Sequence, residues 1–200
     1  MKNLSGAILV GLSTRMGQDK ALLTLNQETF ISHLARELSV CEEVFLCETL
    51  DHDYSEYGLP VIRDEHQGIG PMEGIRRSLF YAAYDHVFIC AVDMPFVRGE
   101  MILCLKRFIS PDYDIYVYKD GDRVHPLCGI YSKRVLPAVG RLIGEGRYRM
   151  MDLLGSVPTR YIDIADSGFS GDMLRNINTP EEYRAICNER KQIPSQSYLT

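Results

Sequence analysis

Short runs of apolar residues alternate along the first half of the chain with segments whose apolar residues recur every three or four positions. The runs predict strands at 6–10, 44–47, 59–62 and 87–92. An unbroken apolar run is typical of a strand covered on both faces, as in a parallel sheet. The recurring spacing predicts helices at 30–38, 72–83 and 101–109. This alternation predicts right-handed β-α-β crossovers and an α/β fold, a three-layer α/β/α sandwich with a Rossmann-like, mostly parallel sheet.

The pattern changes after residue 109. Two apolar runs, 114–118 and 126–131, flank a polar stretch that contains Asp120-Gly121. Because Asp-Gly is a strong hairpin signal, we expect an antiparallel addition to the sheet. Further helices are predicted over 137–143 and from Thr179, which can cap a helix that starts with Pro180-Glu181-Glu182.

Length and charge limit the class of protein. The 200 residues suffice for one domain with a full core, and we expect a single domain over 1–190 and a flexible polar tail at 191–200. The 22 Lys and Arg residues against 27 Asp and Glu residues disfavour a nucleic-acid partner. The apolar runs are too short to span a bilayer, and the N-terminus lacks a signal-peptide pattern. A cytoplasmic protein with no membrane partner is therefore expected.

Polar residues that could bind a ligand follow three of the predicted strands. They are the loop from Gly11 to Lys20, Asp64 and Asp93. In open α/β sheets, ligands bind beyond the carboxyl ends of the strands, so we expect these residues to form one site. The glycines of the loop allow backbone amides to approach an anion, and Arg15 and Lys20 supply cations. The composition of the loop therefore fits phosphate binding and a solvated strand-to-helix loop equally well.

Asp93 closes the most apolar strand, where it can form a turn or bind a cation. Magnesium (Mg2+) takes one or two protein carboxylates together with phosphate oxygens, so one aspartate at a strand end can hold it. Asp64 can bind a ligand or serve as a turn or cap residue. The chain has neither a Gly-x-Ser-x-Gly motif nor a His-x-x-x-His pair, which disfavours a protein nucleophile and a histidine metal site.

Six segments of the chain match motifs of a known protein family, in the same order and over about residues 4–188. They are Leu9-Val-Gly-Leu-Ser-Thr-Arg-Met-Gly-Gln-Asp-Lys20, Val61-Ile-Arg-Asp64, Gly70-Pro-Met-Glu-Gly74, Asp93-Met-Pro-Phe96, His125-Pro126 and Asn176-Ile-Asn-Thr-Pro-Glu181. Together they resemble the nucleotidyltransferases that build activated small molecules from nucleoside triphosphates. Within that group they are most similar to the molybdenum cofactor guanylyltransferases, the molybdopterin-guanine dinucleotide synthesis protein A family.

The resemblance implies a nucleotide-diphospho-sugar transferase-like fold and transfer of GMP from GTP to the terminal phosphate of molybdenum-loaded molybdopterin. Pyrophosphate leaves, the guanine dinucleotide form of the cofactor results, and Mg2+ assists. The implied partners are GTP and molybdopterin, with other cofactor-biosynthesis proteins as further candidates and a monomer or weak oligomer expected. The implied nucleotide-binding residues are Leu9, Val10, Gly11, Lys20, Asp64 and Asp93. The implied catalytic residues are Arg15, Lys20 and Asp93, with Asp93 holding the metal, and the implied molybdopterin-binding residues are Arg15, Arg147, Asn176 and Asn178.

The chain departs from this family in two places. Family members usually have two consecutive glycines in the first loop, whereas Leu12 follows Gly11 directly here and the loop is one residue shorter. Cys47 occupies a position where some members carry an asparagine beside the nucleotide, and Arg149 can take the place of Arg147. Two alternatives therefore stay open: a CTP-dependent or other small-molecule nucleotidyltransferase, and a domain that binds nucleotide or molybdopterin without turnover.

Overall fold

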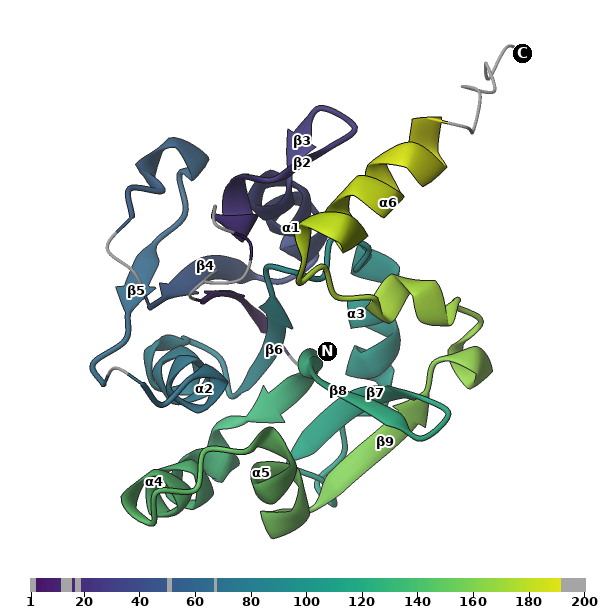
Figure 1. The fold of residues 1–200 in the computed structure, drawn as a ribbon. Coiled ribbons are helices and arrows are strands. Elements are labelled where there is room, and N and C mark those ends of the chain that lie inside the picture. The colour runs from purple at the N-terminus through teal and green to yellow at the C-terminus, as the bar shows by residue number, and fades with distance from the viewer. Residues whose placement is uncertain (1–2, 12–15, 17–18, 50–51, 67, 192–200) are drawn as a thin grey trace.

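The computed structural model describes residues 3–11, 16, 19–49, 52–66 and 68–191. The strands among them are β1 (Ser5–Val10), β2 (Thr24–Leu25), β3 (Glu28–Thr29), β4 (Glu43–Glu48), β5 (Val61–Arg63), β6 (His86–Ala91), β7 (Ile115–Asp120), β8 (Arg123–Ser132) and β9 (Thr159–Asp163). The α-helices are α1 (Phe30–Leu38), α2 (Pro71–Tyr81), α3 (Gly99–Arg107), α4 (Leu136–Gly144), α5 (Met150–Ser156) and α6 (Pro180–Lys191). Figure 1 shows their arrangement.

Among the described residues, one seven-stranded sheet runs in the order β5-β4-β1-β6-β8-β7-β9. β5, β4, β1 and β6 are mutually parallel, with Leu9 of β1 paired to Cys47 of β4 and Ala91 of β6. β8 is antiparallel to both β6 and β7, and β9 joins the edge parallel to β7. The predicted parallel sheet with an antiparallel addition is therefore confirmed. β2 and β3 form a separate two-stranded pair.

Helices cover both faces of the sheet. α2, α4 and α5 lie on one side and α1, α3 and α6 on the other (Figure 1). Two buried clusters fill the spaces between the layers: one includes Leu34 and Ile102, and the other includes Ile75 and Leu142. The predicted three-layer sandwich is confirmed. In the part of the chain that the structure describes, no helix has both the length and the apolar character needed to cross a membrane.

The start of α2 brings the helix against the end of β1. Gly70 precedes the helix with φ +68°, a conformation that favours glycine, and Pro71 takes its first turn. One turn later, a Cβ on Gly74 would lie 3.1 Å from a methyl carbon of Leu9. A glycine at position 74 therefore lets α2 pack closely on the strand end where the predicted site lies.

Four strands and helices of the structure have no counterpart among the predicted ones: β2, β3, α5 and β9. β2 and β3 are each two residues long. α5 is only seven residues long, which is too short for a helical period to be distinctive. β9 is an edge strand in which only Ile162 is buried, so it lacks the apolar run that identified the central strands. The predicted hairpin is confirmed as β7 and β8, which meet at Gly121 and Asp122.

Candidate active site

A cavity of about 460 Å³ lies where β1, β4, β5 and β6 end, within the usual size range of small-molecule sites. The strand ends and the residues after them contribute Leu9, Val10, Gly11, Cys47, Thr49, Asp64, Ala91, Val92 and Asp93 to its lining. Gly70, Pro71 and Gly74 at the start of α2 form a further part of the lining. The cavity is thus at the edge of the sheet where the carboxyl ends of parallel strands meet.

A charged cluster occupies one end of this cavity. The Lys20 ammonium lies 3.1 Å from Asp93 Oδ2 and donates to Asn178 Oδ1 at 2.8 Å. Asn176 Nδ2 donates to Asp93 Oδ1 at 2.8 Å, so both carboxylate oxygens have a donor. The side chains of Lys20 and Asp93 are 13% and 17% exposed. Partial burial and a full set of donors hold the Asp93 carboxylate in one orientation toward the cavity.

Lys20 is positioned by its neighbour Asp19. Lys20 begins a short 3-10 helix that ends at Leu22, and Asp19 Oδ1 caps that helix by accepting from Ala21 N at 2.9 Å. The other oxygen of Asp19 accepts from the hydroxyl of Tyr54 at 2.6 Å. Tyr54 is itself only 2% exposed. A buried tyrosine therefore fixes the turn that directs Lys20 toward Asp93.

The two asparagines reach the site from the C-terminal part of the chain. Ile177, which lies between them, is buried and donates its backbone N–H to the Asp93 carbonyl at 2.8 Å. The helix that follows begins with the predicted capping box: Thr179 Oγ1 accepts from Glu182 N, and Glu182 Oε2 accepts from Thr179 N at 3.0 Å. The start of α6 thus anchors both asparagines beside Asp93.

Asp64 marks the other polar part of the lining, after β5. Its Oδ2 accepts from the Thr49 hydroxyl at 2.9 Å, and the Cys47 thiol lies 3.9 Å from its Oδ1. Burial raises the pKa of Asp64 above its ordinary value, and the hydrogen bond from Thr49 opposes that rise. Burial likewise raises the pKa of the Cys47 thiol to about 12, so Cys47 stays protonated at neutral pH.

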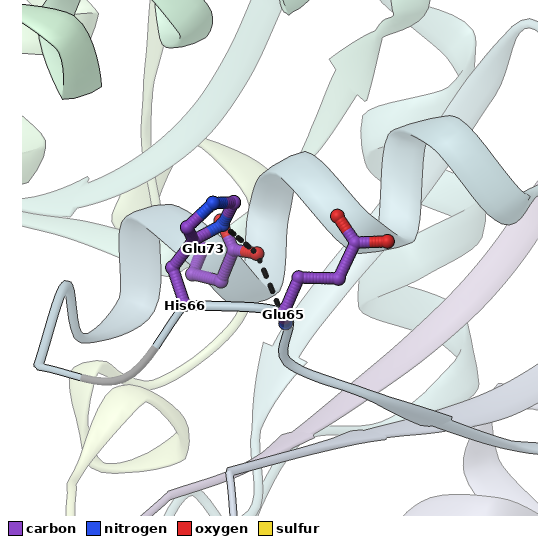
Figure 2. A group of neighbouring side chains, drawn as sticks. All are labelled: Glu65, His66 and Glu73. Carbon is purple, nitrogen blue, oxygen red and sulfur yellow. Dashed lines mark hydrogen bonds and ion pairs between the residues drawn. The ribbon is translucent and has the colours of Figure 1, made fainter.

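Glu65, His66 and Glu73 form a cluster next to Asp64 (Figure 2), and their potential ligand atoms lie within 4.8 Å of one another. Glu73 is fully buried and accepts from Glu65 N and His66 Nδ1, both at 3.2 Å. Arg76 donates to both carboxylate oxygens of Glu73, at 2.7 and 2.8 Å. Because a guanidinium already neutralises the buried carboxylate, we interpret the cluster as a clamp that fastens the segment after Asp64 to α2.

The structure brings most of the predicted site residues together. Leu9, Val10, Gly11, Lys20, Asp64, Asp93 and Asn178 all line the cavity. Asn176 contacts Asp93 from outside that lining. Arg147 lies between α4 and α5, is exposed, and pairs with Glu145 and Asp152 rather than with the cavity residues. Arg149 is also exposed.

Arg15 and Leu12 lie outside the described residues, so the predicted phosphate contact of Arg15 and the effect of the shortened loop stay predictions. Thr49 and Tyr54 were not among the predicted site residues. Thr49 follows β4 at the same edge as Asp64 and Asp93, so its position at a strand end could have identified it. The contact of Tyr54 with Asp19 joins residues 35 positions apart and carries no sequence signal.

The chain matches known proteins over most of its length. A family model described as a MobA-like NTP transferase domain matches residues 6–159. A probable molybdenum cofactor guanylyltransferase of Carboxydothermus hydrogenoformans is 34% identical over 194 residues, which cover 93% of this chain and 96% of that protein. A molybdenum cofactor guanylyltransferase of Vibrio vulnificus is 34% identical over 176 residues, covering 86% and 88% of the two chains.

Solved structures share the fold. One is the molybdopterin-guanine dinucleotide biosynthesis protein A of Archaeoglobus fulgidus, which superposes with a TM-score of 0.82 at 23% identity. The superposition covers 94% of this chain and 100% of that one. The CMP:2-keto-3-deoxy-manno-octonic acid synthetase, solved with CTP, superposes with a TM-score of 0.70 at 14% identity, covering 96% and 99%. The nucleotide-diphospho-sugar transferase-like fold expected from the sequence is thereby confirmed.

Proposed function

This chain belongs to the family of MobA-like NTP transferases, and on that premise we propose that it transfers a guanylyl group from GTP to molybdopterin. In the proposed reaction, an oxygen of the terminal phosphate of molybdopterin forms a bond to the α-phosphorus of GTP. The bond between that phosphorus and the oxygen bridging to the β-phosphate breaks, and pyrophosphate leaves. The product is the guanine dinucleotide form of the cofactor. That the enzyme is a nucleotidyltransferase follows from the family itself.

The observation that carries this proposal is the cluster of Lys20, Asp93 and Asn178 at the strand ends of a cavity large enough for a nucleotide. We assign Lys20 to the phosphates of GTP, because its ammonium is a compact positive charge beside the cavity. Bringing two polyanions together needs neutralisation of their mutual repulsion, and a positioned cation supplies it without a reorganisation cost.

Members of this family generally use a divalent metal ion, and we propose that it is Mg2+ held by Asp93. The donor set fits, because Asp93 offers carboxylate oxygens at the cavity edge and Mg2+ prefers oxygen ligands with substrate phosphates completing its shell. When bound, the ion supplies further neutralisation of the triphosphate charge. Asn176 holds Asp93 in the orientation that this role requires.

The chain's residues need not remove a proton in this reaction. A phosphate monoester has a second pKa of about 6, so the attacking oxygen is already ionised at neutral pH. The remaining catalytic requirement is alignment of the attacking oxygen with the departing pyrophosphate. This agrees with the described part of the cavity lining, in which the charged side chains are Lys20, Asp64 and Asp93 and the one thiol, Cys47, stays protonated.

We assign the nucleoside to the end of the cavity lined by Asp64, Gly70 and Gly74. The resemblance connects the segment Gly70-Pro-Met-Glu-Gly74 with a preference for guanine over cytosine. The carboxylate of Glu73 is turned to Arg76 and His66, so we propose that the backbone and the shape of this segment contact the base rather than that carboxylate.

Acceptor binding is proposed for Arg15, Arg147, Asn176 and Asn178, as the family resemblance implies. Asn176 and Asn178 support this assignment because they stand beside the Lys20–Asp93 pair, where the attacking phosphate must arrive. We also propose that residues 1–190 act as one nucleotidyltransferase domain, in the cytoplasm, as a monomer or weak oligomer. Other proteins of cofactor biosynthesis are proposed as partners.

The proposal is tested by measuring pyrophosphate release from the purified protein with Mg2+, molybdenum-loaded molybdopterin, and either GTP or CTP. We expect release with GTP, little with CTP, and none with either when molybdopterin is omitted. Asp93→Asn should abolish release. Asp85→Asn is the matched control, because Asp85 is exposed and precedes the same strand at its opposite end.

Release with CTP in place of GTP would instead support a cytidylyltransferase. Tight nucleotide binding without release in the wild-type protein would support a non-catalytic carrier. Full activity of Asp93→Asn would remove Asp93 from the reaction.

A further inference from the structure

Thr49 is a cavity residue to which neither the sequence motifs nor the proposed reaction gives a role. It directly follows β4, and its backbone N–H donates to the Val10 carbonyl at 3.1 Å, which ties it to the end of β1. Its hydroxyl donates to Asp64 Oδ2 at 2.9 Å, across 15 positions of sequence. A threonine held by its backbone and by a restricted χ1 rotamer is a rigid support for a neighbouring carboxylate.

Asp64 needs such a support because its surroundings disfavour its charged form. Burial and the nearby carboxylate of Glu73 raise the pKa of Asp64, whereas the hydrogen bond from Thr49, the positive charge of Arg77 and the thiol of Cys47 lower it. Without a strong donor, a half-buried carboxyl group both rotates and takes up a proton more readily. Either change would remove a fixed hydrogen-bond acceptor from the cavity.

Among the described residues, Thr49 is the stronger of the two side chains that donate a hydrogen bond to Asp64. The Cys47 sulfur lies 3.9 Å from Asp64 Oδ1 and also approaches the Gly74 carbonyl at 3.5 Å, so the thiol is shared. A thiol is in any case a weak donor. The 2.9 Å contact from Thr49 is a normal hydroxyl-to-carboxylate hydrogen bond.

We propose that Thr49 is a positioning residue for nucleoside recognition, whose hydroxyl holds the Asp64 carboxylate in place so that Asp64 Oδ1 accepts a hydrogen bond from the bound nucleoside. This inference rests on the proposed function, because it takes the cavity to be the nucleotide site. The nucleoside donor is an N–H of the base or an O–H of the ribose. Thr49 acts through Asp64 and need not touch the nucleotide itself.

The test is equilibrium binding of GTP to the full-length protein, by titration calorimetry between pH 5 and 8, without molybdopterin. Thr49→Val keeps the shape of the side chain and removes its hydroxyl, and we expect the Kd to rise about tenfold, the equivalent of one charge-assisted hydrogen bond. Thr49→Ser restores the hydroxyl and should bind GTP within about twofold of wild type. Thr159→Val is the matched control, because Thr159 donates to the Leu154 carbonyl at 2.8 Å and does not line the cavity.

The pH dependence separates a positioning role from a packing defect. The loss of GTP affinity on acidification should begin at a higher pH in Thr49→Val than in wild type, because the pKa of Asp64 rises further without this donor. Two analogues titrated in place of GTP identify the nucleoside donor. ITP lacks the 2-amino group of guanine, and 2′-deoxy-GTP lacks one ribose hydroxyl. The analogue that lacks the donor should bind the wild-type protein more weakly than GTP does. In Thr49→Val, GTP and that analogue should bind with similar affinity.

Three results would overturn the proposal while leaving the proposed function intact: GTP binding by Thr49→Val within twofold of wild type across the pH range, no rescue by Thr49→Ser, or an equal loss in Thr159→Val. A wild-type protein that does not bind GTP at all would instead contradict the proposed function. The two failures are therefore distinguishable.

Discussion

Replacing Lys20 by methionine removes the ammonium group but keeps most of the length and apolar volume of the side chain. In the structure this deletes one hydrogen bond to Asn178 and the ion pair with Asp93. Asp93 keeps the amide of Asn176, at 2.8 Å. We therefore expect a large loss of GTP binding and a small loss of stability.

The two magnitudes differ because they have different origins. A charge-assisted contact with a phosphate contributes about 2–3 kcal/mol, so the Kd for GTP should rise about 30- to 150-fold. The stability cost falls between that of an exposed ion pair and that of a buried one, because both side chains are about one-sixth exposed: 13% and 17%. We expect about 1 kcal/mol, which lowers Tm by about 2–4 °C in a chain of this size.

The assay pairs titration of GTP with thermal unfolding of the same preparations. Lys106→Met is the matched control. Lys106 Nζ lies 3.2 Å from Glu42 Oε1, an ion pair of similar length, and Lys106 does not line the cavity. It should bind GTP as the wild type does. A Kd for Lys20→Met within threefold of wild type would refute the phosphate role of Lys20. A fall in Tm above about 10 °C would show that Lys20 is chiefly structural.

Asn176→Ala should lower the rate of pyrophosphate release about tenfold with little change in the Kd for GTP, because Asp93 loses the donor that orients it; an unchanged rate would contradict this. Tyr54→Phe should destabilise the protein by about 1–2 kcal/mol in urea unfolding, because Asp19 loses its hydroxyl partner; an unchanged midpoint would show that Tyr54 does not fix the turn before Lys20. Burial opposes ionisation of Glu73, but hydrogen bonds from its neighbours outweigh it and bring its pKa down to about 2. The ionised form therefore contributes stability above the ordinary pKa of 4.5, and that contribution is lost as pH falls toward 2. Glu73→Gln should cost on the order of 2 kcal/mol at pH 7, and its deficit against wild type should shrink at low pH; a deficit independent of pH would refute this interpretation.

The central part of the fold was predictable from the sequence because its strands are buried on both faces. β1 and β6 are almost wholly buried, and burial of this kind requires unbroken apolar runs. In the edge strand β9 only Ile162 is buried, so this strand needs no apolar run and the sequence gives little sign of it. α5 is too short to show a period, so its existence depends on packing against α4 rather than on its own pattern.

The site was predictable to the extent that it follows from strand ends. Gly11, Asp64 and Asp93 meet in one cavity because parallel neighbouring strands end at the same edge. The asparagines at 176 and 178 came from the family resemblance alone, because no local rule places a residue 83 positions away beside Asp93. The same resemblance named Arg147, which pairs with acidic neighbours outside the cavity lining.

A crystal structure of the protein with GTP and Mg2+ tests the central claim most directly. We expect electron density for the triphosphate within hydrogen-bonding distance of Lys20 Nζ, for the metal ion on Asp93, and for the nucleoside beside Asp64. GTP bound elsewhere, for example at the exposed arginines between α4 and α5, with the 460 Å³ cavity filled only by water, would contradict it.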